Sequence, residues 1–118
     1  CIIDDEPLVG RVCKGQLKRL GYDSEIYLDA DLALEAILDP EARFDLVLTD
    51  QSMPRRSGLE IVQALRTAGH ELPVILASGF ADTIAPDELK ANGVTALLSK
   101  PYKLEELRQA VLDALQAS

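Results

Sequence analysis

The chain has 118 residues, of which 47% are hydrophobic, and its 12 Lys and Arg against 20 Asp and Glu give a net charge of −8. This length and composition favour one domain, residues 1–118, with a single buried core. The acidic charge argues against nucleic acid or an anionic membrane as the partner of this domain, and it fits a bound cation or a basic partner surface. No apolar run approaches the roughly 20 residues that span a membrane, and no signal peptide is recognised, so we expect a cytoplasmic domain.

The chain begins within an apolar run, residues 1–3, which predicts a strand. It does not begin with Met, so we expect it to be cut from a longer protein. Pro7 suits the first turn of the following helix, because its missing N–H costs nothing there, and Gly21 is placed to end that helix. The apolar stripe that should face the core contains Val9, Val12, Cys13 and Leu20.

Residues 24–28 carry alternating apolar side chains and predict a short strand near the edge of a sheet. Asp29 suits the N-cap of a helix that stops before Pro40. Residues 46–49 form a short, mostly apolar run that is followed by residues that break strands. This run predicts a central strand at residues 44–49, buried on both faces. Asp50 should therefore lie at the carboxyl end of the central strand.

The second half of the chain continues the alternation of helix and strand. Further helices are expected at residues 57–69, 86–92 and 104–115, and further strands at residues 74–77 and 95–98. The apolar positions expected to face the core from the third and last helices are Ile61, Val62, Leu65, Leu104, Leu107, Val111 and Leu115.

Five alternations of strand and helix predict an α/β fold, with a parallel sheet, helices on both faces and right-handed crossovers. A barrel of eight strands and eight helices would need about twice this length. We therefore expect a doubly wound sheet of five strands in the order 2-1-3-4-5, flanked by five helices. In such a sheet, ligands bind at the carboxyl ends of the strands where the order reverses, here between the first and third strands.

Three carboxylates follow these two neighbouring strands. Asp4 and Asp5 come directly after the first strand and Asp50 after the third, so all three should meet at one rim of the sheet. Crowded carboxylates repel one another unless a positive charge lies among them. Mg²⁺ is the simplest solution, because it prefers oxygen ligands and needs only one or two carboxylates together with water.

The next two strands end in a hydroxyl and an ammonium group, Ser78 and Lys100. A carboxylate, a cation, a hydroxyl donor and a lysine are together the parts of a phosphoryl-transfer site. In such a site the carboxylate attacks phosphorus, and the cation and the lysine neutralise the charge on the phosphoryl oxygens. Taken singly, Ser78 fits an ordinary turn residue and Lys100 a solvated surface lysine, so their combination carries the prediction.

At this point the sequence resembles the receiver domain of bacterial two-component response regulators. The resemblance covers the whole chain and depends on the motifs Asp4-Asp5-Glu6, Asp50 with Met53-Pro54 and Gly58, Ser78, and Lys100-Pro101. It implies that Asp50 accepts a phosphoryl group from the phosphohistidine of a histidine kinase or a histidine phosphotransfer domain. It also implies that the domain catalyses this transfer and a slow autodephosphorylation, rather than acting as a conventional enzyme.

The resemblance assigns further roles to the residues of the rim. Asp5, Asp50 and the backbone carbonyl of Ser52 correspond to direct Mg²⁺ ligands, and Asp4 acts through water. Ser78 bonds to a phosphoryl oxygen and Lys100 pairs with the phosphoryl group. The peptide bond between Lys100 and Pro101 is cis in this family. The domain is expected to be a monomer or a weak homodimer.

The chain departs from the family pattern at two places. Leu97 occupies the position in the fifth strand where the family usually has Tyr or Phe, which puts its usual conformational switch in doubt. Arg55 and Arg56 replace the usual residues of the loop after Pro54, where they could assist a docking partner, attract anions or be solvated loop charges. We also expect Phe80 to shield the phosphorylated residue from water.

The residues leave several alternatives open. The stretch 77–82 is closer to receivers at the carboxyl end of hybrid sensor histidine kinases than to those that precede DNA-binding domains. A receiver-like protein-interaction module that works without phosphorylation is the main alternative function. A Mg²⁺-dependent phosphatase with an aspartate nucleophile would usually have a second acid where Ser52 lies. A carrier of flavin mononucleotide would need phosphate donors where Asp4 and Asp5 lie, and their charge would repel the phosphate.

Overall fold

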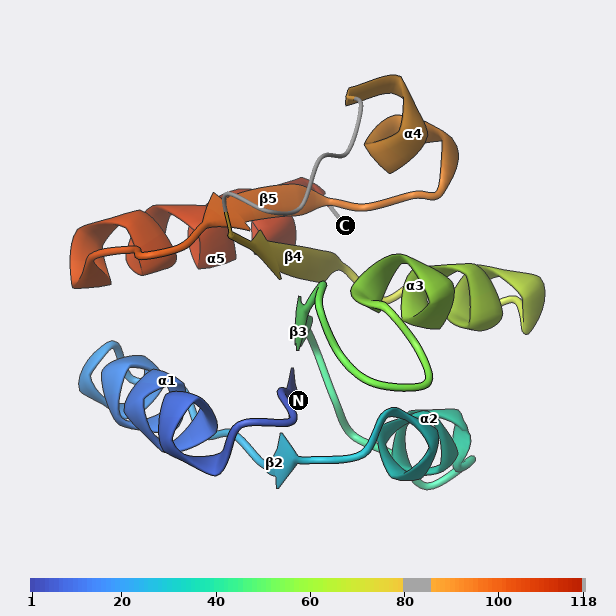
Figure 1. The fold of residues 1–118 in the computed structure, drawn as a ribbon, viewed down its shortest axis with the longest axis horizontal. Coiled ribbons are helices and arrows are strands. Elements are labelled where there is room, and N and C mark those ends of the chain that lie inside the picture. Colours follow the sequence, from blue (N-terminus) through green and yellow to red (C-terminus); the bar gives the residue numbers. More distant parts are fainter. Residues whose placement is uncertain (80–85, 118) are drawn as a thin grey trace.

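The computed structural model contains one sheet of five parallel strands between two layers of helices (Figure 1), and it describes residues 1–79 and 86–117. The strands lie in the order β2-β1-β3-β4-β5, which confirms the predicted fold. In chain order the elements are β1 (Ile2–Ile3), α1 (Pro7–Arg19), β2 (Ile26–Tyr27), α2 (Ala30–Leu38), β3 (Val47–Asp50), α3 (Gly58–Thr67), β4 (Val74–Ser78), α4 (Pro86–Ala91), β5 (Ala96–Ser99) and α5 (Leu104–Ala117).

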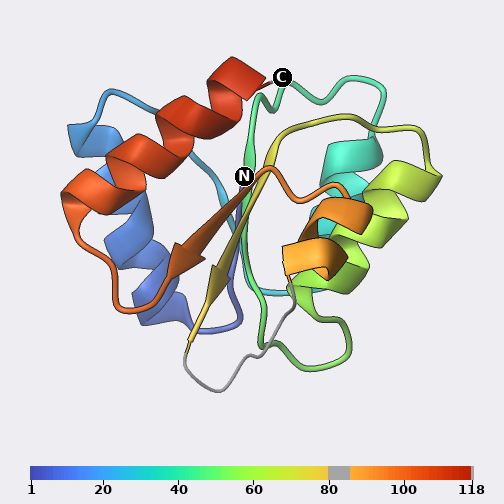
Figure 2. The same ribbon diagram turned by 90° about the horizontal axis from the view of Figure 1, so that it is seen from above.

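The helices divide between the two faces of the sheet. Helices α1 and α5 cover one face, and α2, α3 and α4 lie on the other, as Figure 2 shows from above. Because β3 and β4 lie in the middle, every residue of both strands is buried, as the prediction of a strand buried on both faces requires. Within the part of the chain that the structure describes, no helix has both the length and the apolar character needed to cross a membrane.

Each face of the sheet has its own apolar core. The core under α1 and α5 includes Ile2, Cys13, Leu17, Leu48, Ile75, Leu98, Leu107 and Val111. The core under α2 and α3 includes Ile3, Ala33, Ile37, Val47, Ile61, Val62, Leu65 and Val74. Neighbouring strand residues such as Ile2 and Ile3 belong to opposite cores, because successive side chains of a strand point to opposite faces.

The predicted apolar stripe of α1 is wrong at Val12, which is 62% exposed. The buried positions of this helix are Gly10, Cys13 and Leu17. Gly10 approaches β2 so closely that a Cβ atom there would lie 3.0 Å from Cγ2 of Ile26. This contact turns the side of α1 that carries Gly10 toward the sheet and leaves Val12 in solvent.

Two helices begin at side-chain caps, of which the one at Asp29 was predicted. The Asp29 carboxylate accepts hydrogen bonds from the backbone N–H groups of Asp31 at 2.8 Å and Leu32 at 3.3 Å. The Ser57 hydroxyl accepts from the Glu60 N–H at 3.3 Å, and the Glu60 carboxylate accepts from the Ser57 N–H at 3.0 Å. Such caps satisfy N–H groups that the first turn of a helix leaves without partners.

Gly58 allows α3 to begin directly against the end of β3. A Cβ atom at Gly58 would overlap Cδ1 of Leu76 and would lie 2.7 Å from the carbonyl oxygen of Asp50. The Asp50 carbonyl is backbone of the central strand, and the Leu76 side chain is fully buried, so the first cannot move without displacing the strand and the second has to repack.

We predict that Gly58→Ala lowers the free energy of unfolding by about 1–3 kcal/mol, because the added methyl group overpacks this contact. Gly15→Ala is the matched control, since a Cβ atom at Gly15 meets nothing within 4 Å in the middle of α1. There the same change should raise the free energy of unfolding by up to about 1 kcal/mol through helix propensity. Urea denaturation measures both variants, and an equal effect of the two changes would contradict the close approach at Gly58.

Candidate functional site

Three carboxylates meet at the carboxyl rim of the sheet. Asp4 and Asp5 follow β1, Asp50 is the last residue of β3, and β1 pairs with β3 in parallel. One carboxylate oxygen from each of the three residues lies within 4.8 Å of the other two. Asp4 and Asp50 are buried, with 5% and 8% of their surface exposed, and Asp5 is half-buried. The predicted acidic rim is therefore present.

Lys100, which follows the edge strand β5, brings a positive charge into this rim. Its Nζ atom lies 2.7 Å from Oδ1 of Asp50 and 3.6 Å from Oδ2 of Asp4. Lys100 directly follows β5, and its backbone N–H donates to the carbonyl of Ser78 at 2.7 Å. The Lys100–Pro101 peptide bond is cis, as the resemblance implies.

Ser78 lies beside the rim at the end of β4. Asp50 pairs in register with Ala77, so Ser78 is one residue beyond the partner of Asp50 along the neighbouring strand. Ser78 is only 8% exposed. The five residues predicted to form the site thus lie at the carboxyl ends of four adjacent strands, β1, β3, β4 and β5.

The loop between β3 and α3 is held at its beginning by Gln51, whose role the sequence analysis missed. The Gln51 N–H donates to the carbonyl of Ala77 at 2.9 Å, and its carbonyl accepts from the N–H of Gly58 at 3.1 Å. The Gln51 side-chain oxygen accepts from the N–H of Leu59 at 2.9 Å. The sequence does place the Gln51 amide between the end of a strand and the start of a helix, and this position could have indicated its role. These bonds hold the start of the loop, in which Ser52 follows Gln51, against the ends of β3 and β4.

The electrostatics of the rim leave it short of positive charge. Burial raises the pKa of Asp50, the hydrogen bond and charge of Lys100 oppose this rise, and the charges of Asp4 and Asp5 add to it. Burial by itself lowers the pKa of Lys100, but the hydrogen bond and charge of Asp50 outweigh it and the pKa ends above its usual value. One ammonium group therefore stands against three carboxylates, and hard oxygen donors of this kind suit a metal cation.

Three other residues singled out by the sequence analysis, Leu97, Arg55 and Arg56, do not join the acidic rim. Leu97, at the position where the family usually has an aromatic ring, is 45% exposed on β5. Phe80, expected to shield the site, and residues 80–82 of the stretch 77–82 lie outside the described residues. Arg55 and Arg56 pair with α2 rather than with the rim.

Comparison with known proteins gives consistent results. A family model described as the response regulator receiver domain matches residues 1–112. The chain is 31% identical over 106 residues to the transcriptional regulatory protein DltR of Streptococcus agalactiae, covering 90% of this chain and 46% of that protein. It is 33% identical over 110 residues to the sensor histidine kinase RcsC of Salmonella typhi, covering 93% of this chain and 11% of that protein. The chain therefore spans less than half the length of these two relatives.

A solved structure gives the same fold. The response regulator receiver domain protein of Clostridium thermocellum matches with a TM-score of 0.90 at 24% sequence identity, covering 98% of this chain and 92% of that one.

We predict that Lys100→Met lowers the free energy of unfolding of the metal-free protein by about 1–3 kcal/mol, because it leaves the buried carboxylates without a counter-charge. The expected loss is smaller than for a fully buried ion pair, because the Lys100 side chain is 27% exposed and solvent screens its charge. Adding Asp50→Asn should recover part of the loss by removing one of the carboxylates. Lys103→Met, which changes an exposed lysine of the same segment, should have little effect.

The loss in Lys100→Met should shrink as the pH is lowered from about 8 toward about 5. A carboxyl group whose pKa is raised in the folded state binds protons more tightly there than in the unfolded chain, so acidification favours the folded state. Without Lys100, the pKa of Asp50 should rise further. Urea denaturation with a chelator present, at a series of pH values, measures this. A loss that stays constant with pH would contradict the proposed electrostatics.

Proposed function

Because the chain belongs to the response regulator receiver domain family, the signalling domains of two-component systems, we propose that Asp50 is its phosphoacceptor. The observation that supports this assignment is the position of Asp50, buried at the end of β3 with one carboxylate oxygen 2.7 Å from Lys100 Nζ. The donor would be a phosphohistidine of a histidine kinase or of a histidine phosphotransfer domain.

In the proposed transfer, a carboxylate oxygen of Asp50 attacks the phosphorus atom of the phosphohistidine. A phosphorus–oxygen bond forms as the phosphorus–nitrogen bond breaks, and the bonding electron pair leaves with the imidazole, which takes up a proton. Lys100 neutralises charge on the phosphoryl oxygens, and the Ser78 hydroxyl donates a hydrogen bond to one of them. Slow attack by water on the resulting acyl phosphate would return Asp50 to its carboxylate.

The acidic rim would hold Mg²⁺ during this transfer. The direct ligands would be Asp5, Asp50 and the backbone carbonyl of Ser52, with Asp4 acting through a bound water. When bound, the ion supplies positive charge that offsets both the crowded carboxylates and the incoming phosphoryl group. The fit to this chain rests on the three carboxylate oxygens within 4.8 Å of one another.

The main alternative is a receiver-like interaction module that needs no phosphorylation. Such a module has no need for a lysine among buried carboxylates, because burying these charges costs desolvation energy and serves no purpose in binding a partner. The presence of Asp4, Asp5, Asp50 and Lys100 at one rim therefore favours phosphotransfer.

The setting of the domain in its whole protein is also a proposal. DltR is named as a transcriptional regulator and RcsC as a sensor histidine kinase. We propose that this domain likewise regulates, or is regulated by, attached or separate partners of a two-component phosphorelay in the cytoplasm. The receiver of a hybrid histidine kinase is one such setting, and the domain by itself would be a monomer or a weak homodimer.

Incubation with acetyl phosphate and Mg²⁺ should add one phosphoryl group, which hydroxylamine removes because it cleaves acyl phosphates. Asp50→Asn should abolish the addition, since an amide is a poor nucleophile. Asp45→Asn is the matched control, because Asp45 is an exposed aspartate just before the same strand, at its opposite end. Intact-protein mass spectrometry measures the addition. Full labelling of Asp50→Asn would exclude this residue as the acceptor.

Mg²⁺ should stabilise the folded protein. With a dissociation constant of about 1 mM, 10 mM Mg²⁺ would add about 1.4 kcal/mol to the free energy of unfolding. Asp5→Asn should weaken Mg²⁺ binding by about tenfold or more, because it removes a charged ligand. Asp23→Asn, which changes an exposed aspartate near the opposite rim, should leave binding unchanged. Calorimetric titration gives both affinities, and equal affinity in Asp5→Asn and wild type would refute the assignment of Asp5.

A further inference from the structure

The loop between β3 and α3 turns sharply at a strained residue. Arg55 has φ of +70°, and it is the one residue other than glycine with a positive φ in the described ranges, 1–79 and 86–117. The Arg56 N–H donates to the carbonyl of Pro54 at 2.8 Å, which closes the turn around Arg55. Left-handed backbone is costly for a residue with a side chain, and it persists where the surroundings hold it.

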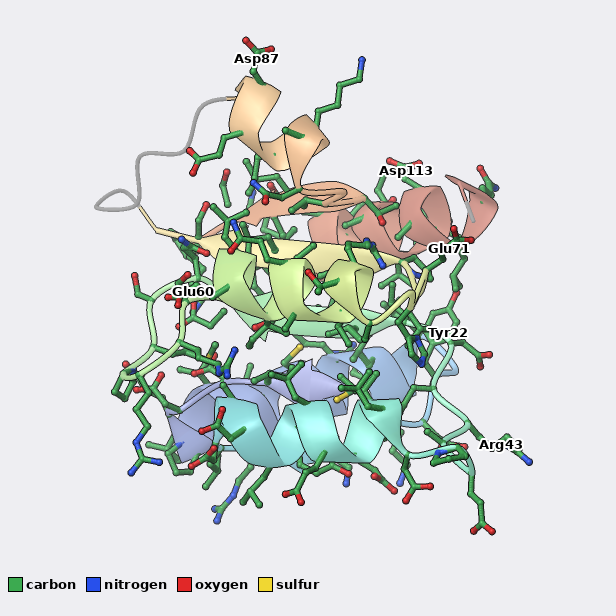
Figure 3. The ribbon with its side chains drawn as sticks, turned by 90° about the vertical axis from the view of Figure 1, so that its right-hand side faces the viewer. Tyr22, Arg43, Glu60, Glu71, Asp87 and Asp113 are labelled. Atoms are coloured by element: carbon green, nitrogen blue, oxygen red, sulfur yellow. The ribbon has the colours of Figure 1, made fainter. Side chains whose placement is uncertain are left out.

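The turn directs two arginine side chains to the beginning of α2. Arg56 Nε lies 2.8 Å from Oδ1 of Asp31, and Arg55 Nη1 lies 3.7 Å from Oδ2 of Asp29. Asp29 caps α2 and Asp31 lies in its first turn. The loop reaches across to α2 in Figure 1, and in Figure 3 it descends toward α2 from the beginning of α3, near the labelled Glu60. We call these four residues the strap.

The strap lies next to the proposed metal ligands. A groove of about 210 Å³ has Asp5 on its lining together with Leu28, Asp29, Ala30, Asp31, Met53, Pro54 and Arg55. The same loop carries Ser52, which follows Gln51 at the end of β3. The hydrogen bonds of Gln51 and the cap at Ser57 fix the two ends of the loop. The strap ties the middle of the loop, at Arg55 and Arg56, to the beginning of α2.

We propose that Arg56 is a positioning residue for the metal site. Its pair with Asp31, assisted by Arg55 and Asp29, holds the loop against α2 and so keeps the Ser52 carbonyl directed at the acidic rim. The inference rests on the proposed Mg²⁺ site, and it adds α2 to the elements that control that site. Coupling of this kind is reciprocal, so bound Mg²⁺ should in turn tighten the strap.

The direction in which Arg56→Gln changes the Mg²⁺ affinity distinguishes a positioning role of Arg56 from a purely electrostatic one. Arg56→Gln removes a positive charge near a cation site, and electrostatics alone would therefore strengthen Mg²⁺ binding. Loss of the strap should instead weaken it, by about two- to five-fold, the range that an exposed ion pair can supply. Arg11→Gln, which changes an exposed arginine of α1, controls for charge and should leave binding equal or slightly tighter.

Restoring the Mg²⁺ affinity by a second substitution tests whether the Arg56–Asp31 ion pair is responsible. Exchanging the charges in Arg56→Asp with Asp31→Arg should restore Mg²⁺ affinity to within about two-fold of wild type. Arg56→Lys should restore less, because an ammonium group cannot reproduce the directed Nε–H bond. As a readout independent of affinity, Mg²⁺ should slow hydrogen exchange at the capped N–H groups of Asp31 and Leu32 in wild type but not in Arg56→Gln.

Calorimetric titration and hydrogen exchange on the folded full chain test these expectations together. Unchanged or tighter Mg²⁺ binding in Arg56→Gln would overturn the strap while wild-type binding, and its loss in Asp5→Asn, left the metal site intact. Weaker binding that the charge exchange does not reverse would overturn the assignment to the Arg56–Asp31 pair. Wild-type protein that binds no Mg²⁺ would overturn both the strap and the proposed metal site.

Discussion

The ion pair between Lys100 and Asp50 is the interaction on which the site depends. It joins the end of β5 to the end of β3 across β4, with 2.7 Å between Nζ and Oδ1. It also supplies the positive charge that lets Asp4 and Asp50 be buried so close together. Because one ammonium group cannot balance three carboxylates, the rim remains suited to a cation and to chemistry that uses charge. The strand order creates this crowding, since it places the ends of β1 and β3 side by side.

The sequence predicted the fold and the rim because both follow from local patterns. Apolar runs bounded by Pro, Gly and Asp mark the strands, and polar residues placed directly after those runs must lie at their carboxyl ends. The error at Val12 and the missed pairing of Arg56 both depend on contacts between residues distant in the sequence. Val12 was placed inside because its spacing fits a helical stripe, and only the close approach of Gly10 to Ile26 decides otherwise. The pairing of Arg56 with Asp31, 25 residues apart, leaves no local signal.

The exposed Leu97 bears on how a signal would leave the domain. A leucine has no ring to follow the Ser78 hydroxyl inward, so the proposed phosphorylation would act instead through the segment after Ser78 and through α4. The carboxyl end of α4 is joined to α3 by the bond from Gln63 Nε2 to Asn92 Oδ1, at 2.9 Å. Arg66 Nη2 also donates to the carbonyl of Gly93, at 2.8 Å. These bonds give α4 a fixed end on which a change near Ser78 can act.

The most direct test of the central claim, that Asp50 is the phosphoacceptor, is chemical identification of the phosphorylated residue. Borohydride reduces an aspartyl phosphate to homoserine, and peptide sequencing by mass spectrometry then locates the altered position. After phosphorylation by a phosphohistidine donor in the presence of Mg²⁺, we predict homoserine at position 50 alone. Homoserine at position 4 or 5, or none in protein that has gained a phosphoryl group, would contradict this account.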